Sequence, residues 1–410
     1  MDDIEHVVVV GAGQAGASGA SRLRTLGYKG AISLIGMEPV PPYQRPPLTK
    51  KYLMGELDFN RLLIKPEDFY SRQDIELHLD LQVINLDRQH QTVLLSDGRT
   101  MPWDRLLLSV GARPKRLPEA LHDKLANIHT VRTLEDVNLL APRLSEAQRA
   151  LIIGGGYIGL ETAAVIRQRG VETILLEAAD RILQRVASEE TSRRMAELHQ
   201  AYGVEIYEQA QIKSIDPVND HCCSVRLDGD RQFVVDLVIV GVGVVPETDL
   251  AERAGLAVCD GIVVDEFCRT SDPRIFAAGD CASFPWRGRR VRLESIQNAN
   301  EQAETAAANI LGQELRYNPT PWFWSDQYEV KLQIAGLNMG YDRIVERRGK
   351  RDGTGSVWYF AHDKLLAVDA FNDGTAYMVG KRLIEAGRSP KRTSVANPDI
   401  PLKSLLGEDQ

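Results

Sequence analysis

The stretch LIIGGGYIGLE, Leu151–Glu161, decides the fold of this chain. A short apolar run, typical of a buried strand, leads into Gly154-x-Gly156-x-x-Gly159, which is the spacing of a dinucleotide-binding turn between a strand and a helix. In such a turn the first glycine allows the bend, the second lets the backbone approach a pyrophosphate, and the third lets helix pack on strand. The N–H groups at the start of the helix then face the phosphates. The stretch therefore predicts a βα unit that binds a dinucleotide.

The same pattern occurs a second time near the start of the chain. HVVVVGAGQAG, residues 6–16, places Gly11, Gly13 and Gly16 at the same spacing after another apolar run. One such match is weak evidence, but two matches about one domain length apart suggest that one chain holds two dinucleotides. This arrangement implies a flavin enzyme that is supplied by a nicotinamide.

Length and composition restrict the class of protein. A chain of 410 residues with 43% apolar and 26% charged residues is expected to form two or three globular domains. No apolar run approaches the ~18–20 residues that span a bilayer, and the N-terminus MDDIEH is acidic where a signal peptide is basic. We therefore expect a cytoplasmic protein without a membrane segment. The net charge of −8 argues against nucleic-acid binding.

The five cysteines do not form a redox or metal motif. None of them is spaced as C-x-x-C, and the spacing of a four-cysteine iron–sulfur protein is missing. We interpret them as reduced structural thiols and predict no metal site. Any iron–sulfur cluster that takes part must then belong to another molecule.

Charge is unevenly distributed along the chain. Residues 281–410 hold 18 Lys and Arg against 16 Asp and Glu, whereas residues 1–280 hold 31 against 41. The basic residues of the later part gather at Arg287/Arg289/Arg290/Arg292 and at Arg347/Arg348/Lys350/Arg351. These groups are either solvated surface or a docking surface for an acidic partner.

Two acidic residues follow the second strands of the predicted βαβ units. Strands over 4–10 and 31–35 flank a helix over 14–27, and Glu38 lies 22 residues after Gly16, where an acid accepts hydrogen bonds from a ribose. In the second unit, a helix over 159–170 and a strand over 171–176 lead to Glu177. A carboxylate there disfavours a 2′-phosphate, which predicts NADH over NADPH, although Arg181 and Arg185 lie nearby.

The remaining segments are predicted from proline, glycine and apolar patterns. Five prolines between positions 39 and 47 predict a rigid connection that delivers Arg45 and Lys50 at defined positions. We further expect a β-rich insertion over 75–110, strands over 238–244 and 270–282, a helix over 294–311, an antiparallel sheet containing 330–334 and 365–368 beside a helix over 376–386, and a loosely held tail after Pro398.

The chain resembles the bacterial NADH-dependent ferredoxin reductases of the glutathione-reductase-like flavoprotein fold, which include the reductase components of aromatic-ring dioxygenases. The stretches PPYQRPPLTK, GGGYIGLE, FAAGDCA, ESIQNANEQA and PWFWSDQYE stand in that family's order and spacing. PWFWSDQYE is the most specific of them because it is not part of a general nucleotide motif. The resemblance implies an α/β fold with an FAD domain at 1–113 and 245–320, an NADH domain at 114–244 and an α+β C-terminal domain at 321–410.

By position, the resemblance implies a set of cofactor contacts. FAD, bound without a covalent link, would meet Gly11, Gly13, Ala15, Gly16, Glu38, Arg45, Lys50, Val83, Arg132, Gly279, Asp280, Ile296 and Trp324. NADH would meet Gly154, Gly156, Ile158, Gly159, Glu161, Glu177 and Gly243. Glu161 would lie beside the nicotinamide and pair with Lys50, and these two are the predicted catalytic residues. Met37 stands where some relatives carry an acid, so Glu38 would contact the ribose alone.

Simpler structural roles are open for four of these residues. Lys50 and Glu38 could be plain surface, Trp324 plain core and Asp280 a helix cap.

The implied reaction takes a hydride from NADH onto FAD and passes single electrons to a separate [2Fe–2S] ferredoxin. That ferredoxin would serve a haem-thiolate monooxygenase or a Rieske dioxygenase. Two rivals are another enzyme of this fold (NADH oxidase or peroxidase, monodehydroascorbate or rubredoxin reductase) and a flavoprotein whose redox state controls binding. A peroxidase would need a cysteine near the flavin, and residues 40–50 contain none.

Overall fold

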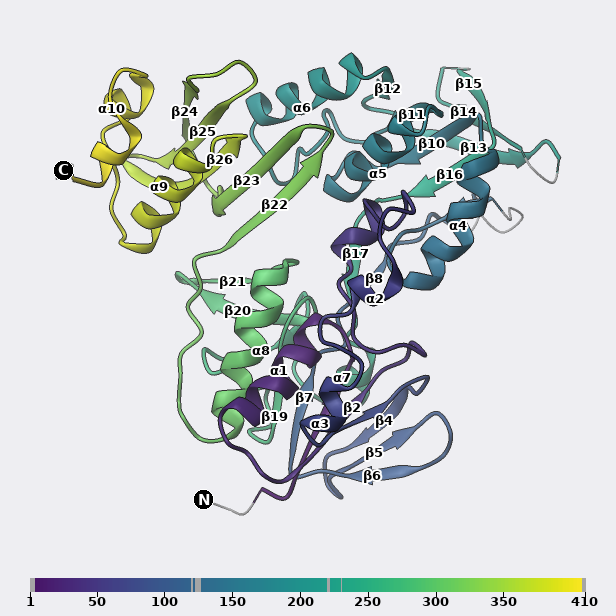
Figure 1. The fold of residues 1–410 in the computed structure, drawn as a ribbon, viewed down its shortest axis with the longest axis vertical. Coiled ribbons are helices and arrows are strands. Elements are labelled where there is room, and N and C mark those ends of the chain that lie inside the picture. The colour runs from purple at the N-terminus through teal and green to yellow at the C-terminus, as the bar shows by residue number, and fades with distance from the viewer. Residues whose placement is uncertain (1–3, 119–120, 122–126, 220–221, 230, 408–410) are drawn as a thin grey trace. The chain divides into compact units, whose positions relative to one another are not determined.

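The computed structural model describes residues 4–118, 121, 127–219, 222–229 and 231–407, and the chain divides into two compact units (Figure 1). Unit 1 consists of Met1–Gln44, Leu57–Arg113 and Val244–Pro319, and unit 2 consists of Arg45–Glu56, Pro114–Gly243 and Thr320–Gln410. The segment Arg45–Glu56, which contains Lys50 and the last two of the five prolines, thus belongs to unit 2, together with the predicted NADH domain and the C-terminal part. The three-domain division itself stays a prediction.

Unit 1 is built on a five-stranded parallel sheet. Its strand order is β19-β7-β1-β2-β3, with bounds Ile275–Ala277, Arg105–Leu108, His6–Val10, Ala31–Ile35 and Ile75–His78. The four valines at 7–10 are almost fully buried because both faces of a parallel sheet are covered. On one face, helix α1 (Gln14–Thr25) packs along α8 (Ile296–Ile310), where Gln14 and Ser18 both donate to Oδ1 of Asn300 (Figure 1).

The other elements of unit 1 are short. They are the helices α2 (Phe59–Leu62), α3 (Phe69–Arg72) and α7 (Asp249–Arg253), the antiparallel sheet β4 (Val83–Asp87), β5 (Thr92–Leu95) and β6 (Thr100–Pro102), the sheet β18 (Ile262–Val263), β20 (Ala282–Trp286) and β21 (Arg289–Val291), and the pair β8 (Ala112–Pro114) and β17 (Val244–Pro246). The predicted β-rich insertion over 75–110 was therefore too wide. Its first and last strands, β3 and β7, pair in parallel within the main sheet, and only β4–β6 form a separate sheet.

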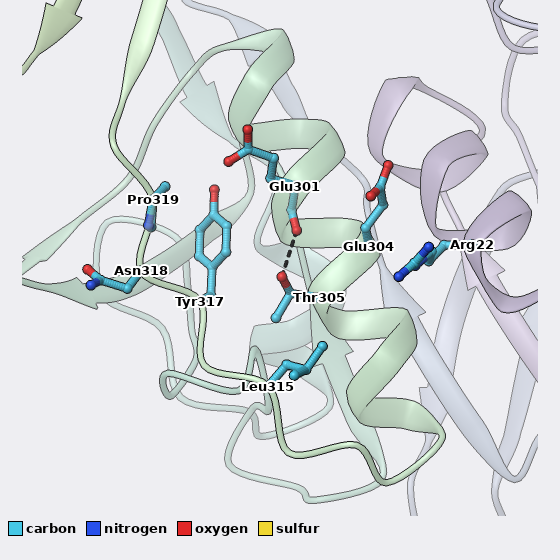
Figure 2. A pocket seen from close by; sticks show the side chains of 8 residues that line it. All are labelled: Arg22, Glu301, Glu304, Thr305, Leu315, Tyr317, Asn318 and Pro319. Atoms are coloured by element: carbon cyan, nitrogen blue, oxygen red, sulfur yellow. Dashed lines mark hydrogen bonds between the residues drawn. The ribbon is translucent and has the colours of Figure 1, made fainter. Parts of the chain in front are cut away.

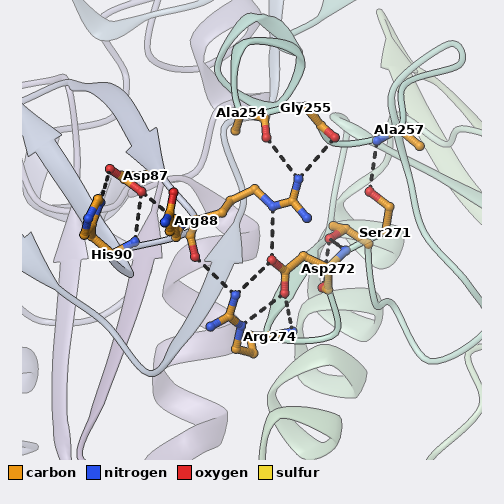
Figure 3. A network of polar contacts seen from close by, with 11 residues as sticks. Asp87, Arg88, His90, Ala254, Gly255, Ala257, Ser271, Asp272 and Arg274 are labelled. Carbon is orange, nitrogen blue, oxygen red and sulfur yellow. Dashed lines mark hydrogen bonds and ion pairs between the residues drawn. The ribbon is translucent and has the colours of Figure 1, made fainter.

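A buried carboxylate ties the β4–β5 turn to the loop before β19 (Figure 3). Asp272 is 4% exposed, and its Oδ2 lies 3.0 Å from Nε of Arg88, while Arg274 donates to both of its oxygens. Burial raises the pKa of Asp272, but hydrogen bonds from Arg274 and Arg88 outweigh it and lower the pKa below its usual value. The network thus joins the β4–β6 sheet to the segment that leads into β19 of the main sheet.

The part of unit 2 that contains the second glycine turn repeats the parallel design. Its sheet has the order β12-β11-β10-β16-β9, with bounds Val204–Tyr207, Glu172–Leu176, Arg149–Ile153, Leu237–Val240 and Ile128–His129. The accompanying elements are the 3-10 helix η1 (Pro46–Thr49), the helices α4 (Leu134–Glu146), α5 (Tyr157–Gln168) and α6 (Glu189–Ala201), and the antiparallel sheet β13 (Ile212–Pro217), β14 (Cys223–Leu227) and β15 (Gln232–Val235). The strand predicted over 238–244 ends at Val240, because the chain turns there and Gly243 takes a φ of +98°.

The C-terminal part of unit 2 is a five-stranded antiparallel sheet. Its order is β22-β23-β26-β25-β24, with bounds Trp322–Gln327, Val330–Gly336, Lys364–Phe371, Gly355–Ala361 and Arg343–Arg348. Helices α9 (Gly374–Glu385) and α10 (Arg392–Ala396) and the 3-10 helix η3 (Leu402–Gly407) complete it.

The described part of the tail, residues 399–407, is packed and hydrogen-bonded, contrary to our expectation of a loosely held tail. Leu405 is fully buried in the core of the C-terminal sheet, and the guanidinium of Arg347 donates to the carbonyls of Val395, Pro398 and Ile400, among others. Arg347 is 5% exposed, so it is also not part of a basic surface. Buried backbone carbonyls need hydrogen-bond donors, and the Arg347 guanidinium is buried because it supplies those donors.

Among the residues that the structure describes, we find no helix whose length and apolar character would let it cross a membrane.

Candidate functional site

The two glycine turns have the same geometry. Gly11 and Gly154 have φ values of +108° and +109°, and a Cβ on them would lie 2.3 Å from the carbonyl oxygen of Ser109 and 2.5 Å from that of Gly241. A Cβ on the third glycines, Gly16 and Gly159, would lie 1.9 and 2.0 Å from the carbonyl oxygens of Gly11 and Gly154. The first and third glycines of both turns are therefore required by the protein's own backbone.

The second glycines differ from their neighbours. A Cβ on Gly13 or Gly156 would have no described protein atom within 4 Å, and both residues have negative φ values, −92° and −78°. Each stands at the N-cap of a twelve-residue helix that has no side-chain cap and no acidic residue in its first turn. Free N–H groups, a positive dipole end and space for close approach suit the phosphates of a dinucleotide. The residues present thus fit the cofactors that the sequence predicts.

The two acidic residues at the strand ends already have hydrogen-bond partners. Oε2 of Glu38 accepts from the hydroxyl of Tyr43 at 2.6 Å. Glu177 accepts from the amide of Gly155 at 2.7 Å and from that of Ala179 at 2.8 Å, so it also braces the glycine turn. Their ribose contacts stay predictions.

The predicted catalytic pair lies together in unit 2. Nζ of Lys50, which follows η1, is 2.5 Å from Oε2 of Glu161 on α5, so the implied ion pair is present. The same oxygen accepts from Oγ1 of Thr49 at 2.9 Å, and Oε1 accepts from Oγ of Ser325 at 2.7 Å. The Glu161 side chain is 5% exposed and that of Lys50 is 20% exposed, so the cation reaches solvent and the carboxylate does not. The roles of both residues beside a flavin stay predictions.

Sequence reasoning missed Thr49 and Ser325, although both lie inside stretches that it used. Ser325 and Gln327 stand two residues apart on β22 and are both buried, which is the period of a strand with one face inward. Gln327 in turn contacts His199 of α6, for which the sequence carries no local signal.

The remaining predicted residues occupy varied settings. The guanidinium of Arg45 donates to the carbonyl of Arg132, so these two residues are brought together. Gly279 donates to Oε1 of Gln302, and the Trp324 ring stacks on that of Trp322 with centroids 5.8 Å apart. Ala15 and Val83 are buried, Ile158 is 49% exposed, Ile296 begins α8, Gly243 has open space at its Cβ position, and the carbonyl of Asp280 accepts from Arg292. Their cofactor contacts stay predictions.

The thiols are free and mostly buried. Burial raises the pKa of the Cys223 and Cys281 thiols to about 11 and that of Cys268 further. Raised pKa values make thiols inert, because the thiolate is the reactive form. Within the described residues, no cluster of His, Cys, Asp and Glu could hold a metal ion.

An open pocket of about 310 Å³ in unit 1 lies apart from these residues (Figure 2). It is lined by Arg22, Glu301, Glu304, Thr305, Leu315, Tyr317, Asn318 and Pro319. None of the predicted site residues contributes to it.

Comparison with known proteins agrees with this geometry. Residues 5–303 match the family model of the pyridine nucleotide-disulphide oxidoreductases, and residues 322–406 match the reductase C-terminal model. A ferredoxin–NAD(P)+ reductase of Sphingomonas sp. is 40% identical, over 99% of both chains. Putidaredoxin reductase of Pseudomonas putida is 39% identical, over 99% of this chain and 98% of that protein. The crystal structure of a covalent putidaredoxin reductase–putidaredoxin complex superposes with a TM-score of 0.94 at 39% identity, over 98% of each chain.

The chain belongs to the pyridine nucleotide-disulphide oxidoreductase family, in its group of ferredoxin reductases. Members of this family use FAD and NAD(P)H. The predicted fold class and family are therefore confirmed.

Proposed function

We propose that the protein is an FAD-dependent NADH:ferredoxin oxidoreductase. It takes a hydride from NADH and passes single electrons to a [2Fe–2S] ferredoxin. The observation that carries this proposal is the pair of glycine turns whose second glycines, Gly13 and Gly156, face open space. Two such turns in one chain suit two dinucleotides, FAD at the first and NADH at the second.

FAD, when bound, supplies the conversion between a two-electron donor and a one-electron acceptor. The protein's share is position and electrostatics. The turn before α1 holds the FAD pyrophosphate, the turn before α5 holds that of NADH, and Glu177 selects the free ribose hydroxyl. Lys50 provides a positive charge for the reduced flavin, and Glu161 sets how much of that charge is available.

The electrons leave to another protein, because the described part of the chain shows no pair of bonded cysteines that could accept them. The buried thiols with raised pKa values do not suit disulphide chemistry. The partner is a ferredoxin, which serves a haem-thiolate monooxygenase or a Rieske dioxygenase. We place this electron transfer in the cytoplasm.

The proposal is tested on the purified protein. We expect one FAD per chain, all of it released by heat or acid, and reduction of cytochrome c by NADH that depends on an added [2Fe–2S] ferredoxin. FMN, no flavin, or two flavins per chain would contradict the cofactor assignment. Rapid NADH oxidation by O₂ or H₂O₂ without ferredoxin would favour an oxidase or peroxidase. Turnover with rubredoxin or monodehydroascorbate alone would favour the other reductases. Stable reduction without turnover would favour a redox-controlled binding protein.

A further inference from the structure

A chain of four hydrogen-bonded side chains runs from Glu161 into the interior of unit 2. Oγ of Ser325 is 2.7 Å from Oε1 of Glu161, and Nε2 of Gln327 is 2.9 Å from Oγ of Ser325. Oε1 of Gln327 is in turn 2.7 Å from Nε2 of His199. No member of the chain is more than 4% exposed. The chain links α5, β22 and α6, and its outer end is the carboxylate that pairs with Lys50.

The carboxylate fixes the direction of every hydrogen bond in this chain. A carboxylate only accepts, so the hydroxyl of Ser325 donates its one proton to Glu161. The oxygen of Ser325 then accepts from the amide group of Gln327, which places the amide carbonyl towards His199. A carbonyl only accepts as well, so His199 donates from Nε2. The ring is therefore the Nε2–H tautomer.

The surroundings of His199 agree with a neutral ring of that tautomer. Burial lowers the pKa of His199, and the hydrogen bond to Gln327 opposes that effect only in part. Its Nδ1 has no partner among the described residues, and the Tyr328 ring stands edge-on at 5.2 Å. A bare acceptor at Nδ1 costs less there than an unpaired donor or a charge.

We propose that Ser325, Gln327 and His199 are positioning residues for Glu161, and through it they tune Lys50. This inference rests on the proposed function, in which Lys50 faces the flavin. Each hydrogen bond in this chain polarises the next one. The hydroxyl of Ser325 therefore draws negative charge from the carboxylate of Glu161. More of the positive charge of Lys50 is then left to stabilise reduced FAD. The amide in the middle cannot pass a proton, so the chain acts through orientation and charge.

The first test concerns the chain itself and needs no turnover. Ring-¹⁵N-labelled holoenzyme should show His199 as the neutral Nε2–H tautomer, with its signal assigned by its loss in His199→Gln. A neutral Nδ1–H ring or an imidazolium at pH 7 would overturn the proposed direction of the chain.

The second test measures the flavin midpoint potential. Ser325→Ala removes a donor from Glu161 and should lower the potential, with a change of about tenfold in the reduction equilibrium, or ~30 mV for a two-electron couple. Gln327→Leu should lower it by less. The double variant should match Ser325→Ala alone, because Gln327 acts only through Ser325.

Ser356→Ala is the matched control. Ser356 is equally buried, lies in the same unit and accepts from Nε1 of Trp358 at 2.9 Å, but none of its described contacts joins it to Glu161. The flavin midpoint potential of Ser356→Ala should equal that of wild type. Additive shifts in the double variant, or equal shifts in Ser356→Ala, would overturn the proposal.

The two proposals fail in different ways. If wild type binds no flavin, the proposed function fails, while the same ¹⁵N measurement on the flavin-free protein still decides the direction of the chain. If wild type binds FAD and serves ferredoxin but the potentials are additive, only the positioning role fails. If Ser325→Ala does not fold, Gln327→Leu and the tautomer still decide.

Discussion

The amide nitrogen of Gly155 lies 2.7 Å from Oε2 of Glu177, so one carboxylate both braces the second glycine turn and stands at the predicted ribose position. Its other oxygen accepts from the amide of Ala179 at 2.8 Å. A charge reversal at this position would release both amides as well as change the charge. A test of nucleotide preference therefore needs a variant that keeps an acceptor.

Glu177→Gln should relax the preference for NADH. The amide keeps one acceptor for the turn and removes the charge that opposes a 2′-phosphate. Like charges at ~4 Å cost roughly 1–4 kcal/mol, so the ratio of kcat/KM for NADPH to NADH should rise about tenfold, measured by steady-state ferricyanide reduction. Glu208→Gln is the control, since Glu208 accepts from the nearby amide of Ile182. An unchanged ratio in Glu177→Gln would mean that another residue discriminates.

Alanine at two glycines of one turn should separate binding from folding. Gly156→Ala should fold as wild type, because its Cβ meets no described protein atom, yet raise KM for NADH by tenfold or more. Gly159→Ala should lose stability, since its Cβ would lie 2.0 Å from the carbonyl oxygen of Gly154. Thermal unfolding and NADH titration measure the two effects. Equal KM values for Gly156→Ala and wild type would contradict the prediction that NADH binds at this turn.

Lys50→Met should bind FAD but reduce it slowly. Without the ammonium, charge on the reduced flavin lacks compensation, so the midpoint potential should fall and the rate of reduction by NADH should drop about tenfold or more. Stopped-flow absorbance and redox titration are the measurements, and Lys51→Met, at the exposed neighbouring position, is the control. If Lys50→Met keeps the wild-type reduction rate and midpoint potential, Lys50 does not stabilise the reduced flavin.

Asp369 should give unit 2 an unusual pH dependence. Burial raises the pKa of Asp369 to about 6, although hydrogen bonds from Tyr359 and Thr191 oppose the rise. The folded protein then binds this proton more tightly than the unfolded chain, so the stabilisation is complete below about pH 4 and is lost as pH rises through about 6. Relative to wild type, Asp369→Asn should gain roughly 3 kcal/mol of unfolding free energy across that window.

Asp272→Asn should behave in the opposite way. The pKa of Asp272 is lowered in the folded state, so its stabilisation is present above the unfolded pKa and is lost on acidification. Thermal unfolding of both variants and of wild type between about pH 2 and 7 compares the two, since the loss for Asp272 falls at the acid end of this range. Parallel pH profiles for wild type and Asp369→Asn would contradict the raised pKa of Asp369.

Docking of ferredoxin should depend on Arg289 rather than on the whole basic segment. Arg290 donates to backbone carbonyls of Val264 and Ser283, and Arg292 pairs with Glu294 and Asp260. Replacing those two would disturb the fold. Arg289→Ala, at an exposed position of β21, should lower kcat/KM for ferredoxin several-fold and flatten its salt dependence, but leave ferricyanide reduction unchanged. A wild-type salt slope would direct the search to Arg348, Lys350 and Arg351.

The parallel sheets could be predicted because their local signals agree with the final packing. The valines at 7–10 and the run at 151–153 are buried on both faces and end in glycine turns, so period, composition and turn chemistry give one answer. The prediction of a loosely held tail was wrong because the contacts that hold residues 399–407 come from residues distant in the sequence. Nothing near Leu405 reveals that Arg347, on a distant strand, satisfies the carbonyls around it.

In the candidate site, too, the contacts between residues distant in the sequence were the ones that the sequence pattern alone did not predict. Lys50 and Glu161 could be paired only through a resemblance, since 111 residues separate them. Thr49 and Ser325 were present in the motifs, but no pattern shows that both donate to one carboxylate. The contact of His199 could not be predicted, because nothing in the sequence of α6 indicates that this histidine hydrogen-bonds to Gln327 on β22.

The strand order of unit 1 has a consequence for biosynthesis. β1 and the first glycine turn leave the ribosome early, but β19 and α8, which complete their sheet and cover α1, are encoded after the whole segment 114–243. At a translation rate of about 5–20 residues per second, the nascent sheet waits some tens of seconds with one edge uncovered. Capture of the flavin is therefore expected as a late event of synthesis, and slow codons or chaperones that act on this interval would alter the yield of holoenzyme more than its activity.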